Sequence, residues 1–327
     1  MSREPAARTA WALLTADLWG LGSHGLLRLP YYLHRFRAGG SDPRAELRLI
    51  AESPATSAFD GGNGLGHWQL WAAAELSARK ARTTGIAAVS VANSGHCGSL
   101  GLYVLPMVAE GLIGLAFSNG PAVMPPWGGH APVLATSPIA AGIPTRPRPA
   151  IVDLATSAVA RGTIAQRRAR QEPLEPGWAF DATGQSTIDP EAALTGMLAP
   201  MGGPKGYALA FLVESLTGGL VGPRLAGDVA DPLSEAAAGD PQGIGHLVLA
   251  LDPSFLDADG ASAERLATLA ARICDAGGRP PGWGRRTDTT LDDEEPLALP
   301  AATRAALAGA AASLGVDLPE RWPPGDA

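Results

Sequence analysis

The sequence has only two cysteines, Cys97 and Cys274, and they lie far apart in the chain. Neither belongs to a CxxC pair or stands near a histidine at the spacing of zinc ligands, so neither a disulfide framework nor a zinc ribbon is indicated. Two separate cysteines without a disulfide pattern fit a reducing compartment, and we expect a cytoplasmic protein.

Positive charge is also scarce, with 25 Lys and Arg against 32 Asp and Glu, a net charge of -7 and a pI near 5.4. This balance provides no broad basic surface for phosphate backbones, so we expect no nucleic-acid partner, although a local cationic pocket could hold a nucleotide. Long apolar runs are missing too. Near the N-terminus, Arg8 and Asp17 bracket a stretch that is too short to cross a membrane, and no secretory cleavage site follows. We expect no membrane partner.

What the chain does contain is 46% hydrophobic residues, 41 Gly and 29 Pro in 327 residues, which indicates a folded, turn-rich protein of one or two domains. Glycine stops and helix-forming residues predict helices over 5–37, 70–84, 259–276 and 299–315, and a buried apolar helix from 204 to 217. Short apolar runs predict strands over 86–94, 111–119, 150–157 and 244–252. The charged, Pro- and Gly-rich segment 279–296 predicts an exposed loop.

Two of the six histidines have neighbours that favour chemistry. His24 follows Ser23 and precedes Arg28 by four residues, so a histidine proton and a guanidinium fork could act on one small carboxylate ligand. The alternative is a helix start that Ser23 caps. His96 lies in ANSGHCGSLG at the end of a predicted strand, where sheet proteins often bind ligands; the alternative is an ordinary turn histidine. No pair of histidines has the spacing of a zinc hydrolase, and we expect no metal.

Glycine-rich stretches give a weaker indication of a nucleotide site. GGNGLG at 61–66 lacks the dinucleotide-binding spacing and follows no strand. MGGPKG at 201–206 opens the predicted apolar helix, where free N–H groups and Lys205 would attract a phosphate or carboxylate. An ordinary loop and helix cap is the alternative. Small polar residues at predicted strand ends could contact ribose and phosphate oxygens, although alone they are typical turn residues: Thr136, Ser137, Asp153, Thr156 and Ser157.

Together these stretches resemble the malate/L-lactate/ureidoglycolate dehydrogenase family of NAD(P)-dependent oxidoreductases. The resemblance covers most of residues 20–253 and includes SHGLLRLPYY, VANSGHCGSLGLYV, VMPPWGG, VDLATSAVARG and MGGPKGYALAFLVESLTGGL. It implies hydride transfer between NAD or NADP and C2 of a small 2-hydroxy or 2-oxo acid. His24 or His96 would exchange the hydroxyl proton, and Ser23 and Arg28 would bind the substrate. The residues implied at the cofactor are Thr136, Ser137, Asp153, Ala155, Thr156, Ser157, Lys205 and Gly206.

For the fold, the resemblance implies an α/β (α+β) protein with a non-Rossmann nicotinamide-binding domain around a mixed, largely antiparallel sheet. We predict this cofactor-binding sheet domain over residues 71–253. Residues 1–70 and 254–327 would form a smaller, mainly helical, discontinuous domain. The resemblance also implies a homodimer with active sites near its interface.

Two alternatives stay open, and the second of them is motivated by two departures from the family pattern. The usual Gly-Thr-Asn-Pro is ATSP at 135–138, and the usual Pro-Gly-Glu is not recognisable in 279–296. One alternative activity is reduction of a cyclic imino acid such as piperideine- or pyrroline-2-carboxylate. A catalytically silent family member that acts in binding or assembly is the alternative from another class.

Overall fold

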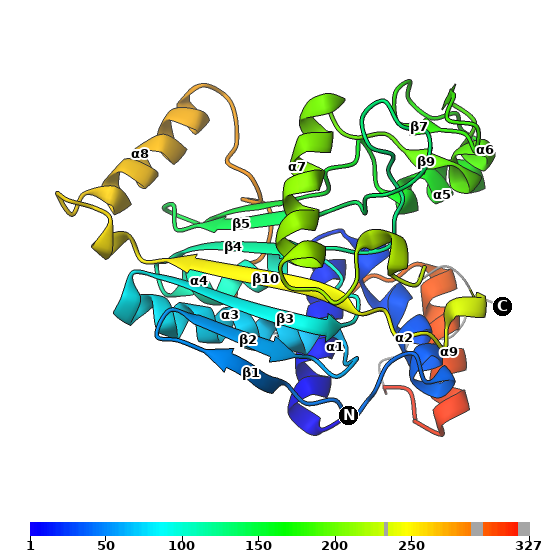
Figure 1. The fold of residues 1–327 in the computed structure, drawn as a ribbon, viewed down its shortest axis with the longest axis horizontal. Coiled ribbons are helices and arrows are strands. Elements are labelled where there is room, and N and C mark those ends of the chain that lie inside the picture. The colour runs from blue at the N-terminus through cyan, green and yellow to red at the C-terminus, as the bar shows by residue number, and fades with distance from the viewer. Residues whose placement is uncertain (232–234, 289–296, 320–327) are drawn as a thin grey trace.

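The computed structural model describes residues 1–231, 235–288 and 297–319, which form a mixed α/β fold around a seven-stranded sheet (Figure 1). The helices are α1 (Arg3–Leu18), α2 (Leu29–Ala38), α3 (Gly66–Thr84), α4 (Leu105–Ala109), α5 (Arg161–Ala169), α6 (Pro190–Thr195), α7 (Pro204–Glu214), α8 (Ser262–Asp275) and α9 (Ala301–Leu314). The strands are β1 (Arg48–Glu52), β2 (Thr56–Asp60), β3 (Ile86–Ser94), β4 (Ile113–Ser118), β5 (Ile139–Ile143), β6 (Ala150–Leu154), β7 (Ala179–Phe180), β8 (Ser186–Thr187), β9 (Met197–Leu198) and β10 (Ile244–Leu251).

The main sheet has the strand order β1-β2-β3-β10-β4-β5-β6. Only β2 and β3 pair in parallel, and every other neighbouring pair is antiparallel. The predicted mixed, largely antiparallel sheet is therefore confirmed. β10 joins the two halves of the sheet, because its Val248 lies opposite Val89 of β3 on one side and Ala116 of β4 on the other.

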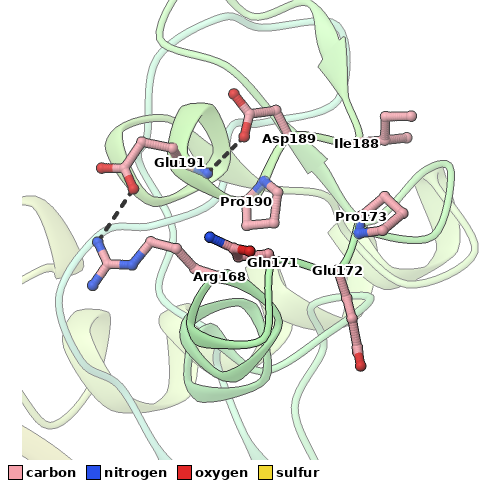
Figure 2. A pocket seen from close by; sticks show the side chains of 8 residues that line it. All are labelled: Arg168, Gln171, Glu172, Pro173, Ile188, Asp189, Pro190 and Glu191. Carbon is pink, nitrogen blue, oxygen red and sulfur yellow. Dashed lines mark hydrogen bonds and ion pairs between the residues drawn. The ribbon is translucent and has the colours of Figure 1, made fainter.

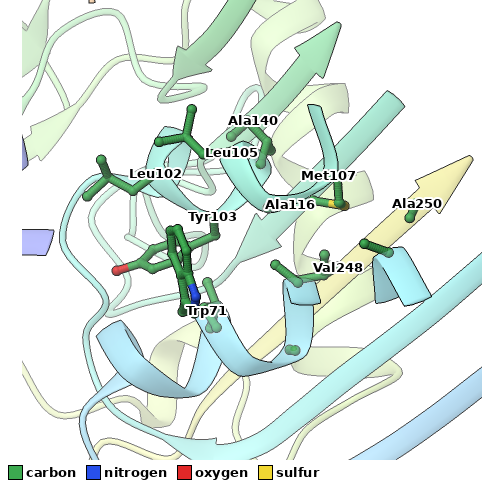
Figure 3. Close-up of a cluster of buried hydrophobic side chains, with 14 of the residues drawn as sticks. Trp71, Leu102, Tyr103, Leu105, Met107, Ala116, Ala140, Val248 and Ala250 are labelled. Carbon is green, nitrogen blue, oxygen red and sulfur yellow. The ribbon is translucent and has the colours of Figure 1, made fainter. Parts of the chain in front are cut away.

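Alternation along the strands gives the sheet two apolar faces. Val248 and Ala250 of β10 pack with α3, α4 and the neighbouring strands in the largest buried cluster, part of which Figure 3 shows. Leu247 lies on the opposite face in a smaller cluster with Phe117 and with Val213 of α7. The helix α3 thus covers one face of the sheet and α7 lies over the other (Figure 1).

Helix ends and central strands follow the sequence closely. α2 ends at Gly39 and α3 ends at Gly85, both with positive φ (88° and 79°), the backbone conformation in which glycine ends a helix without steric cost. The strands predicted over 86–94 and 244–252 are confirmed as β3 and β10. The C-terminal helices are confirmed as α8 and α9.

The prediction that the helix from 204 is buried is wrong. α7 packs through one side only, and Leu209, Phe211 and Leu212 are 37%, 60% and 49% exposed. Only one side of α7 packs against the sheet, so a helix that is apolar on all sides leaves much of its apolar surface exposed.

Six strands, β5 among them, do not correspond to any strand predicted above. β1 and β2 are short, and β1 is exposed along its whole length, so neither has a buried apolar pattern to reveal it. Both pair into the main sheet although they lie within 1–70, the segment predicted as mainly helical; the domain boundary itself stays a prediction. The two-residue strands β7, β8 and β9 form a separate three-stranded sheet beside α5 and α6 (Figure 1). No helix in the described parts of the chain is long and apolar enough to cross a membrane.

Candidate active site

The two histidines singled out from the sequence lie side by side. The ring centroids of His24 and His96 are 6.2 Å apart, and their planes differ by 21°. His24 is the last residue of the first of two short 3-10 helices between α1 and α2, whereas His96 comes from the loop after β3. The fold therefore brings the two motifs, more than seventy residues apart in the printed sequence, to one place.

Ser23, His24 and Arg28 form a connected group. Ser23 Oγ is 2.9 Å from Nδ1 of His24, and Nε of Arg28 donates a hydrogen bond of 2.7 Å to the carbonyl oxygen of Ser23. The alternative role of Ser23 as a helix cap is wrong, because its hydroxyl contacts the imidazole and neither short helix has a side-chain cap. Asp17 of α1 holds this segment by accepting a 2.8 Å hydrogen bond from the backbone N–H of Leu26.

His96 is fixed from three directions. Tyr32 Oη of α2 lies 2.6 Å from Nδ1 of His96, and the backbone N–H of Gly98 donates to the same nitrogen over 3.3 Å. The backbone N–H of His96 donates 3.0 Å to Oε1 of Gln242, which precedes β10. Tyr32 and Gln242 were not predicted as site residues. The only local indication of Tyr32 is its position four residues after Arg28, which puts the two one helical turn apart.

Burial sets the electrostatics of the histidine cluster formed by His24, His67, His96 and His246. Desolvation is the largest cause that lowers the pKa of each of them. The pKa of His67 and that of His246 fall to about 3, and that of His96 falls well below its usual value. For His24, the nearby Arg28 lowers the pKa further and the nearby Asp153 opposes this.

Asp153 at the end of β6 connects the site to the C-terminal segment. Ser99 Oγ donates a 2.7 Å hydrogen bond to Oδ2 of Asp153, and Arg285 lies 3.8 Å from the same oxygen. Arg285 also stacks on Trp19, with 4.9 Å from its guanidinium carbon to the ring centroid. Arg285 was missed because 279–296 was predicted as an exposed loop.

The described part of the segment, 279–288, is a loop as predicted, but the prediction that it is exposed holds only for some of its residues. Pro280 is buried, and the backbone N–H of Ile151 in β6 donates 2.9 Å to the carbonyl oxygen of Pro281. A Cβ on Gly282 would lie 2.6 Å from the carbonyl oxygen of Ile151, so only glycine permits this close approach. Residues 289–296 lie outside the described part of the chain.

The loops predicted to contact the cofactor are joined to one another. The backbone N–H and the hydroxyl of Thr156 both donate 2.9 Å to the carbonyl oxygen of Thr136. The carbonyl oxygen of Thr156 in turn accepts 2.9 Å from the backbone N–H of Met201. Ser137 and Ser157 are buried, and their hydroxyls donate to nearby backbone carbonyls. Ala155, which directly precedes Thr156 in the chain, is partly exposed.

Lys205 and Gly206 lie in the first turn of α7, directly after the turn that includes Met201. Lys205 is exposed and forms no ion pair within the described residues. Gly206 is buried, and a Cβ there would lie 2.2 Å from the carbonyl oxygen of Met201. No side chain caps this helix, whose N-cap is Gly203, and the exposed Trp127 lies beside that glycine. The helix start is therefore open to an anion.

A surface pocket of about 410 Å³ lies apart from these residues, against α5 and α6 (Figure 2). It is lined by Arg168, Gln171, Glu172, Pro173, Ile188, Asp189, Pro190 and Glu191. Arg168 and Glu191 form an ion pair of 3.5 Å across it. It contains none of the predicted site residues. In the described ranges, no group of three or more His, Cys, Asp or Glu side chains is placed to hold a metal ion.

Comparisons with known proteins match nearly the whole chain. A family model described as malate/L-lactate dehydrogenase matches residues 1–308. The chain is 38% identical over 304 residues to the (2R)-3-sulfolactate dehydrogenase (NADP(+)) of Chromohalobacter salexigens, covering 92% of this chain and 89% of that protein.

Solved structures of a dehydrogenase and a reductase also superpose on nearly the whole chain. The sulfolactate dehydrogenase from Methanocaldococcus jannaschii superposes with a TM-score of 0.84 at 29% identity, over 96% of this chain and 92% of that one. The Δ1-piperideine-2-carboxylate reductase from Pseudomonas syringae superposes with a TM-score of 0.85 at 30% identity, over 94% and 92%.

The buried histidines predict how stability depends on pH. Below the ordinary pKa of 6.5 the unfolded chain binds protons that folded His67 and His246 reject until about pH 3, so the free energy of unfolding falls as the pH falls through this range. Each histidine contributes a slope of about 1.4 kcal/mol per pH unit. Urea unfolding from about pH 6 to about pH 5 should show a smaller loss for His67→Gln than for the wild type. Equal slopes for the two proteins would contradict the assignment.

Proposed function

Because the chain belongs to the malate/L-lactate dehydrogenase family, we propose that it is an NAD(P)-dependent dehydrogenase of small 2-hydroxy acids, which it interconverts with 2-oxo acids. The observation that carries this proposal is the contact of His24 with His96 beside Arg28. A relative of similar length, the enzyme from Chromohalobacter salexigens, carries NADP(+) in its name, which supports NADP as one of the two cofactors.

The residues divide the chemistry of the reduction as follows. Arg28 uses Nε for the carbonyl oxygen of Ser23, and its two Nη groups make no hydrogen bond within the described chain, so they can bind a substrate carboxylate through two parallel contacts. The imidazoles of His24 and His96 would face the C2 oxygen, one of them giving a proton and both stabilising negative charge as it develops. The bound nicotinamide supplies the hydride that C2 accepts.

The start of α7 fits the phosphates of such a cofactor. Its uncapped N–H groups and Lys205 provide positive charge at a surface where no side chain competes. Hydrogen bonds link the loops of Thr136 and Thr156 to the turn before this helix, and Asp153 accepts one from Ser99, three residues after His96. We therefore propose that these loops line the path of the cofactor. Asp153 would lie at the nicotinamide end, since it is near His24.

Reduction of a cyclic imino acid is the second candidate. It is favoured by the superposition on the piperideine-2-carboxylate reductase, which is as good as that on the sulfolactate dehydrogenase. The carboxylate contact with Arg28 would be the same, and the proton would go to nitrogen in place of oxygen. Arg28 and the histidines thus serve both reactions, and only turnover of both substrate classes separates them.

We also propose that the protein is a cytoplasmic homodimer. Both cysteines are free, which supports a reducing compartment. Support for a dimer comes from the exposed apolar side of α7 and the turn after it, where Phe211 is 60% and Leu220 is 71% exposed. Such a surface is typical of an interface between protein chains.

The carboxylate contact predicts the effect of a conservative change. Arg28→Lys keeps the charge but loses the planar fork, so kcat/KM for 2-oxo acids should fall about tenfold to a hundredfold, the value of a charged hydrogen bond. The measurement is NAD(P)H consumption on a panel of 2-oxo acids and cyclic imino acids. Arg48→Lys, on the exposed strand β1, is the matched control and should keep full activity. Absence of turnover by the wild type on the whole panel would favour the silent alternative.

Lys205 allows a test of the cofactor site with an internal control, since Lys80 is the one other lysine of the sequence. Lys205→Ala should weaken binding of NADH or NADPH by about 1 to 3 kcal/mol in a fluorescence titration. Lys80→Ala removes a lysine paired with Glu52, away from α7, and should leave the affinity unchanged. An unchanged dissociation constant for Lys205→Ala removes Lys205 from the site.

The homodimer is tested by light scattering. At micromolar concentration the wild type should have the mass of two chains, and the double variant Phe211→Glu, Leu220→Glu should have the mass of one, because two buried carboxylates would oppose association. Both positions are exposed in the single chain, so the variant should fold normally. A wild type that is monomeric and fully active would contradict the dimer.

A further inference from the structure

The contacts of His96 define which of its nitrogens carries the proton. The nitrogen Nδ1 lies 2.6 Å from Oη of Tyr32 and 3.3 Å from the backbone nitrogen of Gly98. A backbone N–H is always a donor, so Nδ1 accepts at this contact and has no proton of its own. Tyr32 then donates as well, since its hydroxyl would otherwise point its lone pair at the lone pair of Nδ1.

Both partners are held firmly in this arrangement. Tyr32 is 1% exposed, and burial raises the pKa of its phenol well above the usual value, so the hydroxyl keeps its proton. Gly98 has φ of 71°, a conformation that few other residues adopt, and a Cβ there would lie 3.1 Å from Nε2 of His67. The loop is therefore built to aim a fixed N–H at Nδ1.

We propose that Tyr32 is a positioning residue that holds neutral His96 as its Nε2–H tautomer, so that His96 donates a hydrogen bond to the substrate oxygen while His24 exchanges the proton. The inference rests on the proposed function for its catalytic part. In the reduction, C2 gains the hydride and its oxygen gains the proton of His24, with the N–H of His96 contributing to the same oxygen. In the reverse direction His24 takes up the hydroxyl proton, since neutral His96 has no free lone pair at Nε2.

The charges around the two rings also favour His24, and not His96, as the residue that exchanges the proton. The groups that act on the charge of His96 are all cationic or become cationic on protonation: His24, Arg28, His67 and His246. Those neighbours oppose a second positive charge on His96. His24 also feels Arg28, but the carboxylate of Asp153 favours its cation. His24 is thus the better placed of the two to bind and release a proton.

The tautomer can be measured without any activity. In the wild type labelled with ¹⁵N-histidine, long-range ¹H–¹⁵N spectra separate the Nε2–H, Nδ1–H and cationic forms, and His96→Gln assigns the signal by its loss. We expect the Nε2–H form for His96 at neutral pH. A signal of the Nδ1–H or the cationic form would overturn the proposal, whatever the enzyme turns over.

The role of Tyr32 is tested with Tyr32→Phe, which removes one oxygen and keeps the ring. The signals of His96 should then show a mixture of forms, and the protonation of His96 followed in the same spectra should move to higher pH, because a neutral ring that loses a donor at Nδ1 is protonated more easily. The value of kcat should fall about tenfold. Tyr31→Phe is the matched control, since it removes the neighbouring hydroxyl, which forms no hydrogen bond with His96 in the described chain.

The two readouts separate the inference from the proposed function. An unchanged spectrum and an unchanged titration of His96 in Tyr32→Phe would overturn the positioning role. A wild type that shows the Nε2–H form, loses it in Tyr32→Phe and turns over no substrate would support the tautomer and refute the proposed function. If Tyr32→Phe does not fold, the wild-type spectrum alone decides on the tautomer.

Discussion

The hydrogen bond between Tyr32 and His96 joins the N-terminal helices to the loop after the central strand β3. Tyr32 belongs to α2, which packs among the N-terminal helices, and His96 belongs to the loop that leaves the central strand β3. With this contact made, His24 from the turn before α2 stacks beside His96 and Arg28 lies within the same group. The candidate site therefore depends on how the loop after β3 lies relative to α2.

Burial outweighs charge throughout this region. Four imidazoles, a phenol and a guanidinium lie close together, and desolvation is the leading cause of the pKa shift of every histidine in the cluster. All four histidines favour the neutral form. A proton that one ring binds therefore stays on that ring and is not shared with the other three. The carboxylate of Asp153 favours His24 for this role. Arg285 and Ser99 hold Asp153 in place, so the C-terminal segment contributes to the site as well.

Features that depend on local sequence could be predicted, and those that depend on distant contacts could not. β3, β10 and the glycine ends of α2 and α3 follow from apolar runs and from backbone freedom at Gly39 and Gly85. His24 and His96 were found through their immediate neighbours, although only the fold shows that they touch. Tyr32 looks like an ordinary aromatic residue, and the approach of Arg285 to Asp153 depends on a loop that returns to the sheet from 130 residues away in the printed sequence. The exposure of α7 was missed because an apolar helix looks the same whether a single chain or a partner covers it.

A crystal structure of the protein with NADP and an unreactive 2-oxo acid analogue tests the central claim most directly. The account predicts that the analogue carboxylate contacts the Nη groups of Arg28, and that its C2 oxygen lies within hydrogen-bond distance of His24 and of Nε2 of His96. The cofactor phosphates should lie at the start of α7, beside Lys205. An analogue bound elsewhere, such as in the pocket against α5 and α6, or one whose oxygen contacts neither histidine, would contradict the account.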